Sequence, residues 1–161
     1  MPPLSPDDRH HLARAVALSR EHMQAGAGGP FGAVIARDGA VIAEGWNQVT
    51  STADPTAHAE VVAIRRACAG EQTFSLAGAT LYASCEPCPM CLAAAYWARL
   101  SRIVYANTRE EAAAIGFDDA LIYDEIAKSP AERPLPTIHA PHEEARAVFA
   151  EWATKADRIA Y

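Results

Sequence analysis

Residues 84–91 read Ser-Cys-Glu-Pro-Cys-Pro-Met-Cys and hold three of the four cysteines of the chain. Cys88 and Cys91 are three positions apart, so if Pro87 opens a helix, both thiolates face the same side of its first turn and can bind one small cation. Thiolate sulfurs suit zinc, which takes four ligands in a tetrahedral arrangement. The spacing therefore predicts a metal site at the start of a helix.

The earlier segment 55–60, Pro-Thr-Ala-His-Ala-Glu, supplies a third ligand in His58. Three protein ligands leave the fourth position of a zinc ion open, as a catalytic site requires, whereas a fourth Cys or His would close a structural site. Glu60 is two residues from His58, and a carboxylate beside such a position can carry protons to a substrate. His-x-Glu followed by Pro-Cys-x-x-Cys matches the signature of zinc deaminases, in which the Glu is not a ligand.

Two other interpretations of the Cys-x-x-Cys pair are a thioredoxin-like redox pair and half of a structural zinc site. Neither explains His58-x-Glu60, and the sequence holds no second Cys-x-x-Cys. The remaining cysteine of the motif, Cys85, either tunes the site or is a buried thiol at the end of a strand. We expect one zinc ion per chain, bound by His58, Cys88 and Cys91.

Composition places the chain among folded proteins of about one domain: it has 161 residues, of which 50% are hydrophobic and 21% charged. The net charge is −6, and Lys and Arg form no long cluster, so the sequence predicts a small neutral or cationic substrate and no nucleic-acid partner. The longest apolar run, residues 92–98, is too short to cross a membrane. Cysteines used as metal ligands indicate a reducing cytoplasm.

The pattern of apolar and turn-forming residues predicts a mixed sheet of about five strands with helices on both faces, a three-layer α/β/α fold. The expected helices span residues 6–25, 55–69, 87–99 and 141–155, and the expected strands span residues 31–37, 40–47, 80–84, 102–105 and 137–139. Asp38-Gly39 indicates a hairpin between the first two strands. Leu12, Val16 and Met23 are expected to face the core from the first helix, and its histidines to lie on the surface.

With these motifs placed, the chain resembles the cytidine-deaminase-like superfamily, and within it most resembles the bacterial guanine deaminase family. The resemblance covers nearly the whole chain. It is carried by Tyr161 and by residues 29–35 (GPFGAVI), 54–61 (DPTAHAEV), 80–91 (TLYASCEPCPMC), 96–99 (YWAR), 116–119 (GFDD) and 122–126 (IYDEI). The zinc motif specifies only the superfamily, whereas Gly-Phe-Asp-Asp and the terminal Tyr indicate the narrower family.

The resemblance implies a role for each matching residue. Asn47 would hydrogen-bond the purine, Phe31 would stack on it, and Ala57 would contact it. Glu60 would carry protons beside the zinc ion, and Asp119 would be a second catalytic carboxylate that also faces the amine of the substrate. Tyr161 would close the site against water.

The implied reaction is the hydrolysis of guanine to xanthine and ammonia by one domain spanning residues 1–161. The implied assembly is a homodimer in which the segment from about 137 to 161 can be exchanged between subunits; residues 129–136 are rich in proline and could act as the hinge. Alternative substrates are guanosine, cytosine and adenosine in tRNA, although the acidic charge disfavours tRNA. A non-catalytic zinc scaffold is a further alternative, against which Glu60 argues.

Overall fold

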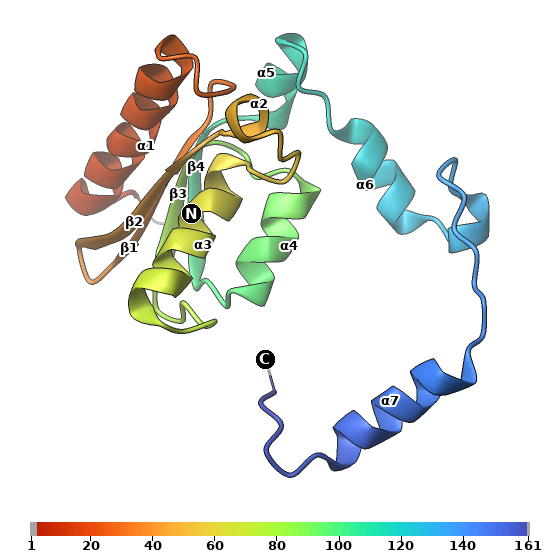
Figure 1. Ribbon diagram of the computed structural model, residues 1–161. Helices are drawn as coiled ribbons and strands as arrows, with labels where there is room; N and C mark the ends of the chain where they lie inside the picture. Colours follow the sequence, from red (N-terminus) through yellow and green to blue (C-terminus); the bar gives the residue numbers. More distant parts are fainter. Residues whose placement is uncertain (1–2, 161) are drawn as a thin grey trace. The chain divides into compact units, whose positions relative to one another are not determined.

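The computed structural model describes residues 3–160, which form two compact units, one ending at Asp119 and the other beginning at Ala120 (Figure 1). In chain order the elements of the first unit are α1 (Pro6–Gln24), β1 (Gly32–Arg37), β2 (Ala40–Trp46), α2 (Val49–Thr52), α3 (Ala59–Glu71), β3 (Thr80–Cys85), α4 (Pro89–Trp97), β4 (Arg102–Asn107) and α5 (Arg109–Ala114). The second unit contains α6 (Ala120–Ala127), a 3₁₀ turn η1 (Pro130–Glu132) and α7 (Glu143–Thr154).

The first unit is built on a four-stranded sheet in the order β2-β1-β3-β4. β1 pairs antiparallel with β2 and with β3, whereas β3 and β4 are parallel. Asp38 and Gly39 connect β1 to β2 with φ values of 52° and 79°, the backbone that a tight hairpin turn requires. The predicted hairpin is therefore confirmed, and α4, which carries two of the cysteines, connects the two parallel strands.

The predicted fifth strand is wrong. Within the described residues the sheet has four strands, and residues 137–139 adopt no strand conformation. Ile138 is 87% exposed, so its β-branched side chain has no packing partner. A strand needs a neighbouring edge to pair with, and local β-propensity does not provide one.

Helices cover both faces of the sheet, as predicted, and Figure 1 shows α1 on one side and α3 with α4 on the other. On the α1 side, buried Ala15 and Leu18 pack with Val34 and Tyr82 of the sheet. On the other side the cluster is rich in alanine and includes the buried side chains of Ala33, Ile35, Ala59, Ala63, Ala67 and Leu81. Small side chains bring α3 close to the sheet, which fixes where its first turn lies.

The buried face of α1 differs from the predicted one. Val16 and Met23 are 39% and 44% exposed, while Ala15 and His11 are buried. A Cβ on Gly32 would lie 2.3 Å from the carbonyl oxygen of Ala15, so the helix backbone rests directly on β1. That close approach selects the face with the smaller side chains, and it buries His11 against the ring of the sheet residue Tyr82 at a centroid distance of 5.1 Å.

A buried carboxylate ties α1 to the far edge of the sheet. Asp8 and Ser5 form a capping box, in which the Ser5 amide donates to Asp8 Oδ2 (2.9 Å) and the Asp8 amide donates to Ser5 Oγ (3.1 Å). Asp8 Oδ1 also accepts from the Tyr82 hydroxyl (2.8 Å) and forms an ion pair with Arg102 (2.6 Å). The Arg102 guanidinium, followed by these other donors, holds the pKa of Asp8 well below its usual range.

The second unit has little interior of its own. Lys128 forms an ion pair with Glu125 (2.6 Å), and Arg133 donates to the carbonyl oxygens of Glu125 and Lys128 (3.1 and 3.0 Å). Between residues 120 and 160 no described residue is buried, and several large apolar side chains are exposed, including those of Phe149 and Trp152 on α7. The predicted last helix is confirmed as α7. No helix among residues 3–160 has both the length and the apolar character that crossing a bilayer requires.

Candidate active site

The two segments of the zinc motif lie at the starts of α3 and α4, but both helices begin later than predicted. α3 begins at Ala59 and leaves His58 as its N-cap with extended backbone. Before it, the chain turns: Asp54 Oδ1 accepts from the amide of Thr56 (2.8 Å), and the carbonyl oxygen of Asp54 accepts from the amide of Ala57 (3.1 Å). This Asx turn competes with the helix and keeps His58 outside it.

α4 begins at Pro89 and not at Pro87, so Cys88 is the N-cap and Cys91 lies in the first turn. The reason is steric, because a proline disfavours helical backbone in the residue before it. Cys88 is accordingly extended, with φ −61° and ψ 168°. His58 and Cys88 thus occupy equivalent positions on neighbouring helices, from which their side chains can turn toward each other.

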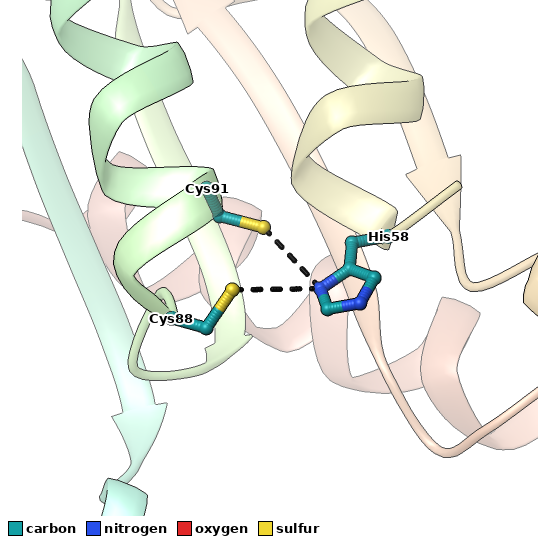
Figure 2. Close-up of side chains that lie close together, drawn as sticks. All are labelled: His58, Cys88 and Cys91. Atoms are coloured by element: carbon teal, nitrogen blue, oxygen red, sulfur yellow. Dashed lines mark hydrogen bonds between the residues drawn. The ribbon is translucent and has the colours of Figure 1, made fainter. Parts of the chain in front are cut away.

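Figure 2 shows His58, Cys88 and Cys91 converging from these two helix starts. His58 Nδ1 lies 3.6 Å from Cys88 Sγ and 3.5 Å from Cys91 Sγ. A tetrahedral zinc ion with bonds of about 2.3 Å to sulfur and 2.0–2.1 Å to nitrogen would separate these atoms by about 3.5 Å. All three ligand atoms lie within 4.8 Å of one another. The donor set and its spacing therefore fit zinc, and the structure brings together the three predicted ligands.

The pKa values of the two thiols are shifted in opposite directions. A hydrogen bond from Cys91 lowers the pKa of Cys88 to about 4, with a further contribution from His58. The pKa of Cys91 is raised, first by that bond to Cys88 and then by burial. Cysteine binds metal as the thiolate, so zinc uptake releases the proton that remains on Cys91.

Glu60 lies beside the group of three ligands and is not a member of it. Its side chain is buried, and its Oε2 accepts from Cys91 Sγ at 3.4 Å. Burial raises the pKa of Glu60, which brings a carboxylate closer to the range in which it can both accept and return a proton. Because His58 is the N-cap, Glu60 and the imidazole can lie on one side although they are only two residues apart.

Asn47 and Phe31 lie on neighbouring segments next to β1 and β2. The amide of Asn47 donates to the carbonyl oxygen of Phe31 (3.0 Å). The buried Asn47 side chain accepts through Oδ1 from the amides of Gly29 (3.1 Å) and Val49 (3.2 Å). Both partners are N–H donors, so the oxygen must face them, and the NH₂ group is turned away from them.

The other predicted site residues lie at three different places. Ala57 is buried next to His58, and its carbonyl oxygen accepts from the Gln48 amide (2.9 Å). Asp119 is half-buried at the end of the first unit; burial raises its pKa, and the charge of Cys88 raises it further. Tyr161 lies outside the described residues.

Sequence reasoning left Cys85 open and assigned no role to Phe117. Cys85 is the last residue of β3, is buried, and donates to the carbonyl oxygen of Thr108 (3.6 Å). Burial raises the pKa of its thiol to about 11, so it fits the interpretation as a buried thiol at a strand end. Phe117 contacts Phe31 with perpendicular rings. Its place in the Gly-Phe-Asp-Asp segment was the only signal in the sequence that could have drawn attention to it.

Residues 5–107 match the family model described as the cytidine and deoxycytidylate deaminase zinc-binding region. The chain belongs to this family of zinc deaminases. The region covers α1 through β4 and includes all three metal ligands and Glu60.

The chain is also similar to guanine deaminase from Bacillus subtilis (strain 168), with 51% identity over 150 residues, which are 93% of this chain and 96% of the relative. The crystal structure of the B. subtilis enzyme superimposes with a TM-score of 0.92 at 50% identity and covers 95% of this chain and 98% of that one. The likeness extends through the second unit, which the family model does not reach.

Two further relatives are more distant. The structure of guanine deaminase from Nitrosomonas europaea has a TM-score of 0.67 and 31% identity, and the alignment covers 74% of this chain and 68% of that one. A tRNA-specific adenosine deaminase from Haemophilus influenzae is 41% identical over 96 residues, 56% of each chain. The match to the tRNA enzyme covers little more than half of either chain.

Proposed function

We propose that the protein hydrolyses guanine to xanthine and ammonia at a zinc centre formed by His58, Cys88 and Cys91. The observation that carries the proposal is a three-ligand group with the spacing of a zinc site and a buried carboxylate, Glu60, directly beside it. The high identity to a guanine deaminase along nearly the whole chain selects the substrate. Burying a carboxylate that binds no metal costs free energy, and a non-catalytic zinc scaffold would gain nothing to offset that cost.

Glu60 is the proposed proton carrier. When bound, zinc supplies a Lewis acid that makes water nucleophilic near neutral pH. Glu60 takes a proton from the water as its oxygen bonds to C2 of guanine, and delivers that proton to the adjacent ring nitrogen. Glu60 then transfers the proton of the new C2 hydroxyl to the amine, the bond between C2 and the exocyclic nitrogen breaks, and ammonia leaves while C2 retains the oxygen as a carbonyl. Burial of Glu60 supports this role, because it makes the protonated form accessible.

The remaining site residues are proposed to recognise the base. Asn47 offers its NH₂ group to an acceptor on the purine, since its oxygen is already engaged by two amides. Phe31 provides a ring for stacking, and buried Ala57 an apolar contact beside His58. Asp119 is the proposed second carboxylate, which accepts from the amine and assists its departure.

We also propose a homodimer in the cytoplasm, in which the segment from about residue 137 to 161 reaches the partner. The support is physical: α7 exposes Phe149 and Trp152, and residues 120–160 bury no described side chain among themselves. Such apolar surface is expected to be covered in solution. Tyr161 would then close the site of the partner or of its own subunit against water. Thiolate ligands favour a reducing compartment.

The proposal is tested by ammonia release from a panel of guanine, guanosine, cytosine and a tRNA anticodon stem-loop with adenosine at the wobble position. Guanine should react fastest, since a site built on hydrogen bonds to one base rejects others by leaving its own polar groups unpaired. Faster ammonia release from guanosine or cytosine would overturn the proposed substrate but not the proposed hydrolytic deamination. Release only from the RNA would show that the protein acts like the tRNA-specific adenosine deaminases, despite its net charge of −6.

A further inference from the structure

Phe117 makes a ring contact that the proposed reaction does not explain. Its ring centroid lies 4.8 Å from that of Phe31, and the two ring planes are perpendicular at 90°. Perpendicular pairs at this distance are favourable because the positive edge of one ring meets the negative face of the other. The second side-chain torsion of a phenylalanine is otherwise broad, so such a neighbour fixes the plane of the Phe31 ring.

The end of α5 places Phe117 at this position through its backbone. Gly116 has a φ of 96°. The Gly116 amide donates to the carbonyl oxygen of Ala113 (3.0 Å), and the Phe117 amide donates to the carbonyl oxygen of Ala112 (3.0 Å). These two bonds form a Schellman motif, which ends the helix without help from the Phe117 side chain. The side chain is 47% exposed, so filling the core does not explain the ring.

Gly29 connects the ring pair to the residue proposed to hydrogen-bond the base. A Cβ at Gly29 would lie 3.2 Å from Cζ of Phe117 and 3.4 Å from Cδ2 and Cε2 of Phe31. The amide of Gly29 donates to Oδ1 of Asn47 (3.1 Å). Phe117, Phe31 and Asn47 therefore all lie next to Gly29. A shift of either ring would displace Gly29, whose amide orients the Asn47 side chain.

We infer that Phe117 is a positioning residue for the substrate, which holds the Phe31 ring in the plane on which the purine stacks. The inference rests on the proposed function, because it requires a base on Phe31. Phe117 acts through Phe31 and takes no part in proton transfer. Its loss should therefore raise KM for guanine and leave kcat nearly unchanged.

The test is a double-mutant cycle of Phe31→Leu and Phe117→Leu in the zinc-loaded protein. The readouts are KM and kcat for guanine and the calorimetric Kd of hypoxanthine, which has the rings of guanine without the amine and cannot be deaminated. Phe117→Leu should raise KM and Kd about two- to tenfold, the value of one aromatic pair. In a Phe31→Leu background it should change neither, because the ring that it positions is gone.

Two further variants keep the test decisive. Gly29→Ala retains both rings but places a Cβ 3.2 Å from Cζ of Phe117, so that ring must shift by a few tenths of an ångström against Phe31; hypoxanthine binding should weaken even if Phe117→Leu folds poorly. Phe74→Leu is the matched control: Phe74 is 49% exposed and follows the opposite end of α3 from His58, so this change should leave KM and Kd unaltered.

The possible outcomes separate the inference from the function on which it rests. Unchanged hypoxanthine binding in Phe31→Leu would overturn both the stacking role and the inference. Weaker binding in Phe31→Leu with no change in Phe117→Leu would overturn the inference alone. Equal, additive losses from the two substitutions would also contradict it, because Phe117 would then act independently of Phe31.

Discussion

Residues 3–119 and 120–160 differ in how they are held together. The first unit buries side chains on both faces of its sheet and fastens its first helix through Asp8, Tyr82 and Arg102. The second forms two α-helices and a 3₁₀ turn with local polar contacts and buries no described side chain. The first unit can therefore hold a metal site by itself. The second unit exposes its apolar side chains and would need another surface to cover them.

The difference separates two kinds of function. The three metal ligands, Glu60, Asn47 and Phe31 all come from the first unit, where their backbone positions are fixed by helix caps and strand ends. The proposed closing residue, Tyr161, comes from the second. Chemistry is thus expected to fail when the first unit is altered, and access and assembly when the second is altered.

The largest effect is expected from Cys88→Ser. Loss of one thiolate from a three-ligand site should reduce bound zinc from about one per chain to near zero, and ammonia release to background. Metal analysis of the purified variant checks this. Cys68→Ser, on α3 and outside the ligand group, is the control and should keep its zinc. Full zinc retention in Cys88→Ser would disprove the ligand assignment.

Glu60→Gln should separate metal binding from chemistry. The amide keeps the shape of the side chain and cannot carry the proton, so zinc content should persist while kcat falls by at least ~10²–10⁴. Glu71→Gln at the other end of α3 is the control, because Glu71 pairs with Arg37 on the surface (2.8 Å) and should not affect kcat. Loss of zinc together with activity would mean that Glu60 is a ligand.

Deletion of residues 157–161 probes the second unit. The truncated protein should fold and bind zinc, and guanine turnover should fall by roughly tenfold or more because the site is left open to water. Mixing it with the full-length Glu60→Gln variant should restore part of the turnover if the tail acts on a partner. Undiminished turnover after truncation would show that the second unit does not close the site.

The smallest effect is expected from Asp8→Asn, which tests the stability of the first unit. The variant should unfold more easily by ~2 kcal/mol at pH 7, because the amide removes the negative charge that pairs with Arg102 and replaces one of the two accepting oxygens with an NH₂ donor. In the wild-type protein the pKa of Asp8 in the folded state lies below the value of about 3.9 in the unfolded chain. Asp8 therefore stabilises the protein above pH ~4, and the contribution disappears as pH falls through the lower folded pKa.

Urea titrations of both proteins at several pH values measure this difference. The difference in unfolding free energy between wild type and Asp8→Asn should be full at neutral pH and should narrow below pH ~4, because Asp8 of the unfolded wild type then binds a proton that the folded protein does not. A constant gap across the acid range would contradict the role of the ionised carboxylate. Asp7→Asn, in the same first turn and exposed, is the control and should change stability little.

The metal ligands could be predicted from the sequence because residue type and short spacing are enough to identify them. The identity of His58, Cys88 and Cys91 and their spacing limit the site to a soft, tetrahedral cation, and the structure brings the three together. Their placement was predicted less well. An Asx turn at Asp54 and the steric demand of Pro89 make α3 and α4 begin later than the pattern predicts, so that His58 and Cys88 are N-caps.

Features that depend on partners distant in the chain were not predicted. The buried face of α1 depends on the contact of Ala15 with Gly32, which turned a face with fewer large apolar residues inward. Residues 137–139 have strand propensity, but a strand forms only against an available edge. The contact of Phe117 with Phe31 joins segments more than eighty residues apart, and no local pattern indicates it.

The most direct test of the central claim is to incubate the zinc-loaded protein with guanine in ¹⁸O-labelled water and analyse the product by mass spectrometry. We predict xanthine that carries one solvent oxygen, ammonia in equal amount, and neither product with Glu60→Gln on the same time scale. Unconverted guanine, with zinc bound and the protein folded, would contradict the account, and so would xanthine formed equally fast by Glu60→Gln.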